Sequence, residues 1–179
     1  MALSDVTTER LQLSRWDVAL HTPALTRLNA CPVAVRYLND GVPYTAPESA
    51  AQSRRFAAHW EQHGFGLWAV RVRATGEVIG FTGLSHPLWF PRVAHEVEVG
   101  WRLHPSAWGN GYATEAGRAA VAAARTSLGL SRLIAVIDPE NVASIAVAKR
   151  LGFGRESVGA HPQRPGTIEL YALHLAATP

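Results

Sequence analysis

Two glutamates near the middle of the chain are the side chains best suited to take up a proton. Residues 95–103 alternate polar and apolar types, which predicts a strand with Glu96 and Glu98 on the same face. A carboxylate can act as a general base, and two neighbouring carboxylates would raise each other's pKa towards neutrality. The pair therefore indicates a base or a site for a cationic group, unless both side chains simply face solvent at a sheet edge.

A glycine-containing turn follows this strand and leads into a predicted helix at 113–128. Its sequence over 108–114 is WGNGYAT. Glycine lets the backbone approach a ligand closely, and the unpaired N–H groups of a helix start can bind an anion. A P-loop would need lysine after its second glycine, where this chain has Tyr112, and a dinucleotide fingerprint would need glycine in place of Thr114. The turn is therefore an anion site of another kind or an ordinary strand-to-helix connection.

The elements that would position these residues follow the order of a mixed α/β fold. Strands are expected at 9–16, 67–73, 77–85, 95–103, 133–137, 153–159 and 167–175. Helices are expected in pieces over 17–37, at 49–63, at 113–128, and from Asn141, a possible cap, to Gly152. Pro43 and Pro47 forbid a continuous helix through 38–49.

The composition limits the classes of function. The chain has 179 residues, with 17 Lys and Arg against 14 Asp and Glu, and one cysteine. The length fits one domain over 1–179, and a single cysteine excludes an internal disulfide framework. Because the basic residues are scattered and no long apolar run occurs, neither nucleic acid nor a membrane is expected as a partner. We expect a cytoplasmic protein that is a monomer or a homodimer.

Four segments together resemble the GCN5-related N-acetyltransferase (GNAT) superfamily, in particular its branch of ribosomal-protein N-terminal (alanine/serine) acetyltransferases. WGNGYA (108–113) is similar to the family's acyl-CoA motif, Gln/Arg-x-x-Gly-x-Gly/Ala, with tryptophan at the first position. ERLQLSRW (9–16), EVGWRLHP (98–105) and the stretch from DPEN to LGF (138–153) resemble other segments of this branch in the same order. The resemblance implies a single GNAT-type α/β domain, with a mixed, mostly antiparallel twisted sheet of about seven strands flanked by about four helices.

The resemblance also implies a donor, acetyl-CoA, with succinyl-CoA or another acyl-CoA as alternatives. The eight histidines have no regular spacing, so no metal site is expected. The pyrophosphate of the donor would rest on the amides of 109–114, and its pantetheine arm would lie between the strand ending at Leu103 and the strand at 133–137. Main-chain groups of Trp101 and Leu103 would pair with this arm, and the side-chain amide of Asn141 would contact it. The expected cofactor-binding residues are Trp101, Arg102, Leu103, Trp108, Gly109, Asn110, Gly111, Tyr112, Ala113, Thr114 and Asn141.

Acetyl transfer to an amine needs a base, hydrogen-bond donors for the oxyanion and a proton for the departing thiolate. Glu98 matches the glutamate of the branch's Glu-Ile-Gly-Tyr pattern and is the expected base, with Glu96 acting through water or binding a cationic acceptor. The tyrosine that many members use as the acid is replaced by Ala148. Ser144, which the branch also has, is the candidate acid, and a bound water or direct thiolate release would also suffice.

The resemblance therefore implies an acyl-CoA-dependent N-acyltransferase that works by direct attack in a ternary complex. A protein or peptide α-amine is the leading acceptor. The alternatives are a small amine (a polyamine, an amino acid or an aminoglycoside) and a non-catalytic module that senses acyl-CoA. Trp89 and Phe90 fall in a loop between prolines and would wall the acceptor cleft with Tyr44 and residues 160–166. An exposed packing cluster or a dimer contact would explain the two residues equally well.

Overall fold

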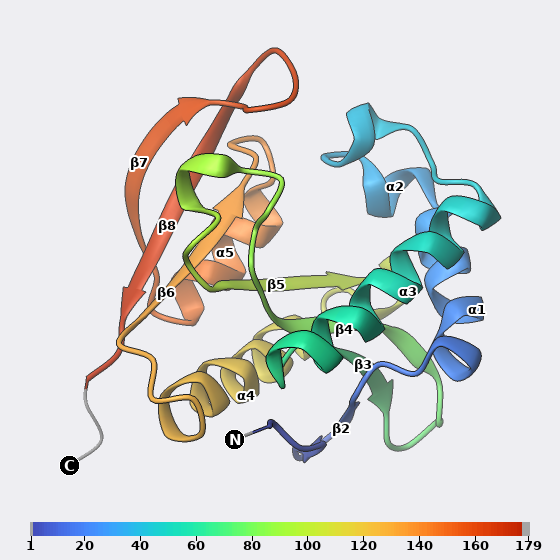
Figure 1. Cartoon of the computed structure of the whole chain (residues 1–179). Helices are drawn as coiled ribbons and strands as arrows, with labels where there is room; N and C mark the ends of the chain where they lie inside the picture. Colours follow the sequence, from blue (N-terminus) through green and yellow to red (C-terminus); the bar gives the residue numbers. More distant parts are fainter. Residues whose placement is uncertain (1, 177–179) are drawn as a thin grey trace.

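An eight-stranded sheet forms the centre of the molecule, with its strands in the order β1-β2-β3-β4-β5-β6-β8-β7 (Figure 1). The structure, a computed structural model, describes residues 2–176. Its strands are β1 (Val6–Thr7), β2 (Leu11–Ser14), β3 (Leu67–Val72), β4 (Val78–Ser85), β5 (Glu98–Leu103), β6 (Arg132–Ile137), β7 (Gly154–Ala160) and β8 (Thr167–His174). Within these residues every neighbouring pair is antiparallel except β5 and β6. The predicted fold class is confirmed, and the short β1 is the strand beyond those expected.

Helices pack on both sides of this sheet. Those in residues 2–176 are α1 (Val18–Asn29), α2 (Pro32–Val35), α3 (Ala46–His63), α4 (Tyr112–Thr126) and α5 (Val142–Arg150). α1 and α3 pack together on one side of the central strands, and α4 and α5 lie on the other (Figure 1). α2, a single turn, falls with α1 in the range 17–37, where helix was expected in pieces. In this part of the chain no helix has both the length and the apolarity needed to cross a membrane.

The start of α3 differs from the prediction. The helix begins at Ala46, so Pro47 lies in its first turn, where the missing N–H of proline removes no helical hydrogen bond. Thr45 Oγ1 accepts a hydrogen bond from Glu48 N, and the Glu48 carboxylate accepts one from Thr45 N at 2.7 Å. This reciprocal capping box stabilises the helix start. The proline that was expected to interrupt the helix therefore opens it.

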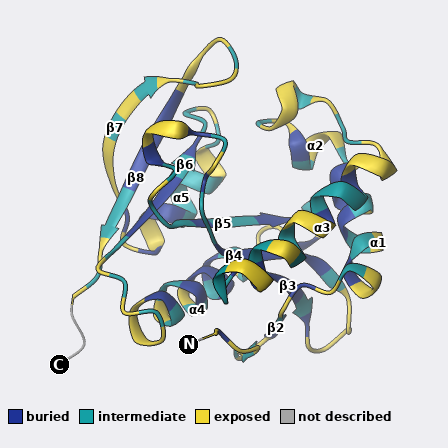
Figure 2. Ribbon diagram, viewed as in Figure 1, coloured by how far each residue is buried: buried dark blue, intermediate teal, exposed yellow. Residues whose placement is uncertain are grey.

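Buried residues are concentrated along the central strands, whereas β7 and the outer helix surfaces are largely exposed (Figure 2). Trp60 and Trp68 are almost completely buried, with their ring centroids 5.4 Å apart. Trp16 is also buried. Trp101 is only partly buried, because it lies on β5 where the sheet opens.

That opening lies between β5 and β6. The two strands are paired only at Glu98 and Ile134, whereas β5 pairs with β4 along its whole length. The predicted separation between the strand ending at Leu103 and the strand at 133–137 is confirmed. β5 also begins later than expected, because Glu96 N–H donates to the Val93 carbonyl at 2.9 Å and places the preceding residues in a turn.

Candidate functional site

Backbone groups of β5 line the gap between β5 and β6. The N–H of Ile134 donates to the Val97 carbonyl at 3.0 Å, whereas the N–H of His104 donates to the carbonyl of Ile79 on β4 at 2.7 Å. Alternate residues of a strand direct their backbone groups to opposite neighbours. The backbone N–H and carbonyl groups of the odd-numbered residues of β5 therefore point into the gap, and those of the even-numbered residues point towards β4.

Trp101 and Leu103 thus carry backbone groups that an extended ligand in the gap can reach. The Leu103 carbonyl already accepts a hydrogen bond from the Trp108 indole at 2.8 Å, which leaves the Leu103 N–H and both groups of Trp101 for a ligand. Arg102, in contrast to the prediction, turns its main chain away from the gap, because it pairs with Phe81 on β4.

The Glu98 side chain lies where the strands separate. Its Oε1 accepts a hydrogen bond at 3.3 Å from the N–H of Val136, which lies beyond the single paired position of β6. Burial raises the pKa of Glu98 to about 7, and the Val136 N–H opposes this shift only in part. The carboxylate can therefore gain or lose a proton near neutral pH.

Glu96 does not lie with Glu98 at the point where β5 and β6 separate. It precedes β5, and its carboxylate forms an ion pair with Arg132, Nε to Oε1 at 3.2 Å. Arg132 also pairs with Glu156 at 2.7 Å. The prediction that a neighbouring glutamate raises the pKa of Glu98 is wrong, since burial is what raises it. Glu96 instead helps to hold the edge of the sheet together.

The glycine turn has the geometry of an anion site. Gly109 and Gly111 both have a φ of 77°, a left-handed conformation that favours glycine. α4 starts at Tyr112, and its first helical hydrogen bond runs from Glu115 N to the Gly111 carbonyl at 3.0 Å. The N–H groups of residues 112–114 therefore have no partner within the helix. The Asn110 side chain donates to the Ala107 carbonyl at 3.2 Å and so supports the turn rather than a ligand.

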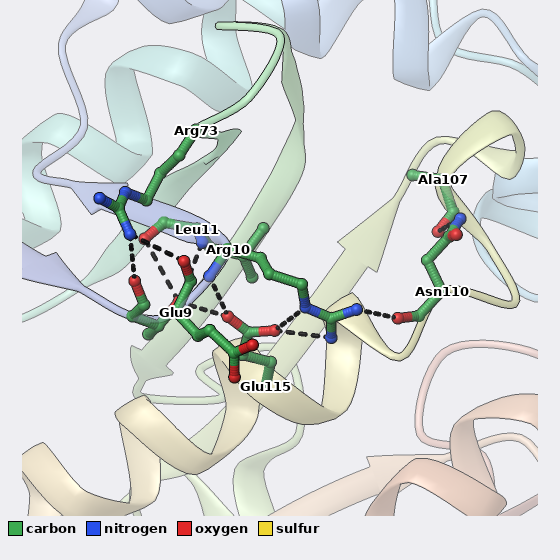
Figure 3. Close-up of polar contacts among 8 residues, drawn as sticks. Glu9, Arg10, Leu11, Arg73, Ala107, Asn110 and Glu115 are labelled. Carbon is green, nitrogen blue, oxygen red and sulfur yellow. Dashed lines mark hydrogen bonds and ion pairs between the residues drawn. The ribbon is translucent and has the colours of Figure 1, made fainter.

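An ion pair that the sequence did not predict fastens this turn to the start of the chain (Figure 3). Glu115 accepts hydrogen bonds from Thr8 Oγ1 at 2.6 Å, from Arg10 N at 2.9 Å and from Arg10 Nε at 2.7 Å. Arg10 also donates to the Asn110 carbonyl at 2.9 Å. Partial burial opposes ionisation of Glu115, but these hydrogen bonds hold its pKa below the ordinary value. The partners are about a hundred positions apart, so no local pattern links them.

At the start of α5, Asn141 acts as the helix cap, with its Oδ1 accepting from Ser144 N at 3.1 Å. Within residues 2–176 neither the Asn141 side-chain NH₂ nor the Ser144 hydroxyl has a hydrogen-bond partner. Asn141 can therefore serve as a cap and still donate to a ligand, and the partly buried Ser144 hydroxyl lies one turn before Ala148, which is fully buried.

A cleft of about 370 Å³ opens beside the gap, and we call it the Trp89 cleft. It is lined by Tyr37, Leu38, Asn39, Asp40, Tyr44, Trp89, His161, Gln163 and Arg164. The predicted grouping of Trp89 with Tyr44 and the loop at 160–166 is thereby confirmed. Arg164 joins that loop to Asp138 at 3.0 Å and to the Tyr37 carbonyl at 3.1 Å.

Phe90 does not line the Trp89 cleft. It is 6% exposed and packs with Ile134, Ile168 and Leu170, so the prediction that it walls the cleft is wrong. Trp89 lies on the outer side of the same apolar cluster and stacks on His161, with ring centroids 5.6 Å apart. Because Ile134 is the residue paired with Glu98, this cluster connects the cleft to the opening of the sheet.

Residues 10–154 match the sequence model of a protein family described as acetyltransferase (GNAT) domain. The protein YkkB of Bacillus subtilis (strain 168) is 32% identical over 114 residues, which are 61% of this chain and 64% of YkkB. The chain thus spans less than two thirds of the length of this curated relative.

Solved structures with the same fold cover nearly the whole chain. An acetyltransferase from Agrobacterium tumefaciens str. C58 has a TM-score of 0.80 and 30% identity, covering 98% of this chain and 96% of that one. RimL, a ribosomal L7/L12 α-N-protein acetyltransferase solved with coenzyme A, has a TM-score of 0.76 at 20% identity, covering 97% of this chain and 98% of that one. At that identity the likeness concerns the fold alone.

Proposed function

Because the chain belongs to the acetyltransferase (GNAT) family, we propose that it is an N-acetyltransferase that transfers an acetyl group from acetyl-CoA to a primary amine. The observation that carries this proposal is the Glu98 carboxylate, which lies where β5 and β6 separate and has its pKa raised to about 7. A general base works best when its pKa lies near the working pH. Glu98 meets that condition in the gap where the acyl group would lie.

The residues around the gap fit acyl-CoA as the co-substrate. The N–H groups of Tyr112, Ala113 and Thr114 lie at the positive end of the α4 dipole and would hold the pyrophosphate. Backbone groups of Trp101 and Leu103 would pair with the amides of the pantetheine arm, as an added strand does. Acetyl-CoA, when bound, supplies an acetyl group activated as a thioester.

Different residues of the chain would then serve the separate steps of the transfer. Glu98 takes a proton from the amine as its nitrogen attacks, and later releases that proton to solvent. N–H groups of β5 that face the gap donate hydrogen bonds to the oxygen on which negative charge develops. Ser144 is the proposed donor of a proton to the departing thiolate, since Ala148 has no group to donate.

We take the Trp89 cleft as the acceptor site, because its apolar cluster reaches the residue paired with Glu98. A protein or peptide α-amine is the leading acceptor, supported by the sequence resemblance. A small amine is the second candidate. The replacement of the usual tyrosine by Ala148 favours a third, a module that binds acyl-CoA without turnover.

Thiol release from acetyl-CoA and from succinyl-CoA, measured across a panel of peptides and small amines, tests this proposal. We expect turnover with at least one amine, and a loss of about a hundredfold or more in kcat for Glu98→Gln. Glu61→Gln, an exposed glutamate on α3, is the control and should keep the rate. Tight binding of CoA without turnover on any amine would support the sensing module, and no binding of CoA would exclude both.

A further inference from the structure

A buried arginine on β5 has no acidic partner among the described residues. Arg102 is 8% exposed, and its one hydrogen bond within residues 2–176 runs from Nη2 to Oε1 of Gln52 at 3.4 Å. Its Nε and Nη1 atoms are shielded from solvent and have no hydrogen-bond partner in that part of the chain. Arginines that do pair with carboxylates are Arg10, Arg132, Arg155 and Arg164. Buried charges in proteins are usually paired, so a partner for Arg102 is missing.

Two aromatic rings compensate for only part of this charge. Cζ of Arg102 lies 4.9 Å from the ring centroid of Phe81 and 5.9 Å from that of Tyr44. A ring face attracts a cation, but it does not occupy the in-plane N–H groups with which a guanidinium binds oxygen atoms. Burial lowers the pKa of Arg102 to about 10, which leaves it charged at neutral pH. The guanidinium is therefore ready to bind an anion.

Arg102 lies behind the wall of the Trp89 cleft. Tyr44 lines the cleft and also stands against the guanidinium. Gln52, the residue that Arg102 contacts on α3, also accepts a hydrogen bond from Asn29 at 2.9 Å, and Asn29 Oδ1 has no partner among the described residues. Arg102 follows Glu98 by four positions on the same face of β5, which is about 13 Å along an extended strand. One acceptor molecule can therefore reach both side chains.

We propose that Arg102 binds a carboxylate carried by the amine acceptor, so that the enzyme selects acceptors with an amine at Glu98 and an anion at Arg102. This inference rests on the proposed function, because it names the substrate class of the same site. A rotation of the Tyr44 side chain, of the kind that side chains often make on binding, would admit the carboxylate to the guanidinium. The carboxylate belongs either to a small amino acid or to an acidic side chain near a peptide N-terminus.

The first test compares matched acceptors. If the acceptor is a small amine, we expect wild-type kcat/KM to be about ten- to hundredfold higher for ω-amino acids of a suitable chain length than for their carboxamides. If the acceptor is a peptide, we expect the same ratio between peptides with glutamate and peptides with glutamine after the first residue. Preference within the first set identifies a small acceptor, and preference within the second a peptide. Arg102→Gln should remove the preference, Arg102→Lys should keep part of it, and the exposed Arg54→Gln should keep all of it. Equal rates for carboxylates and carboxamides in the wild type would overturn the inference.

A second test needs no turnover, so it separates this inference from the proposed function. Hexanoate should raise the Tm of wild-type protein more than hexanamide does, and Arg102→Gln should abolish the difference. Because the variant also removes an unpaired buried charge, it should be at least as stable as wild type without ligand. A lower Tm for Arg102→Gln, with the two probes acting alike on wild type, would assign Arg102 to the core and overturn the inference. A hexanoate effect that depends on Arg102 would uphold it even if no amine were acetylated.

Discussion

At the scale of single residues, Glu98 illustrates how the separation of two strands changes a carboxylate. Burial raises its pKa from the ordinary 4.5 to about 7, although the Val136 N–H favours the ionised form. The folded chain therefore binds the Glu98 proton more tightly than the unfolded chain does. Ionisation of Glu98 consequently costs stability, which is lost as the pH rises from 4.5 to about 7.

Replacing Glu98 with glutamine should reveal this cost. Glutamine can still accept the Val136 hydrogen bond but carries no charge, so Glu98→Gln should raise the free energy of unfolding at about pH 8 by up to about 3 kcal/mol. Near pH 4.5 wild-type Glu98 is protonated and the two proteins should be nearly equal. Urea unfolding at both pH values measures the difference, with Glu61→Gln as the control. A gain that is the same at both pH values would contradict the buried ionisation.

Residue types and spacing were enough to identify Glu98 but not its surroundings. The alternation over 95–103 also placed Glu96 beside it, whereas a turn before β5 and the distant Arg132 separate the two. Arg102 was grouped with the donor-binding residues because it lies between Trp101 and Leu103. Its missing partner became visible only from three-dimensional contacts, since burial of a charge depends on every element packed around it.

At the scale of elements, local signals predicted most helices and strands, and errors occurred where two signals competed. Pro47 indicates a break, but the capping box from Thr45 to Glu48 turns the same proline into a helix start. The glycines at 109 and 111 predicted the turn before α4, and both adopt the left-handed conformation that glycine favours. What holds the turn in place, the pairing of Glu115 with Arg10, joins distant segments and has no local signature.

That pairing should matter for binding of the donor. Glu115→Gln removes the charge that holds Arg10 against the turn, so we expect several-fold weaker binding of CoA and a loss of about 1–2 kcal/mol in the free energy of unfolding. Calorimetric titration with CoA and urea unfolding measure the two effects. Glu9→Gln is the matched control, because Glu9 lies beside the same network and its carboxylate has no hydrogen bond among the described residues (Figure 3). Unchanged affinity for CoA in Glu115→Gln would mean that the turn keeps its shape without the ion pair.

At the scale of the whole molecule, the sheet divides the site into two parts. The glycine turn lies where β5 meets α4, on one side of the sheet. The Trp89 cleft is lined by Tyr44, which stands against Arg102, and the guanidinium of Arg102 contacts Gln52 of α3 on the other side. The fold class and the gap between β5 and β6 were predictable, because they follow from the order of elements and from the family resemblance. The lining of the cleft was only partly predictable, since Phe90 and Trp89 are adjacent in sequence yet one is buried and the other faces the cleft.

A histidine cluster joins α3 to the segment that follows β4. His59 on α3 stands with its Nδ1 2.8 Å from the Phe65 carbonyl, so that nitrogen carries the proton, and its Nε2 accepts from the N–H of His86 at 3.2 Å. The ring of His63 lies 4.4 Å from that of His59 and 4.9 Å from that of His86. Burial, together with charge repulsion from the two neighbouring histidines, lowers the pKa of His59. The folded chain therefore favours the neutral form of His59 more strongly than the unfolded chain does.

Acid should weaken the fold through this cluster. Because the pKa of His59 is lower in the folded chain than in the unfolded chain, the unfolded chain binds more protons once the pH falls below about 6.5, and stability declines there. His59→Gln keeps one donor and one acceptor but cannot ionise, so its Tm should fall less than that of wild type between about pH 7 and about pH 5. The exposed His95→Gln should follow wild type. If His59→Gln and wild type lose Tm in parallel over this range, the acid sensitivity of the fold has its origin in other groups.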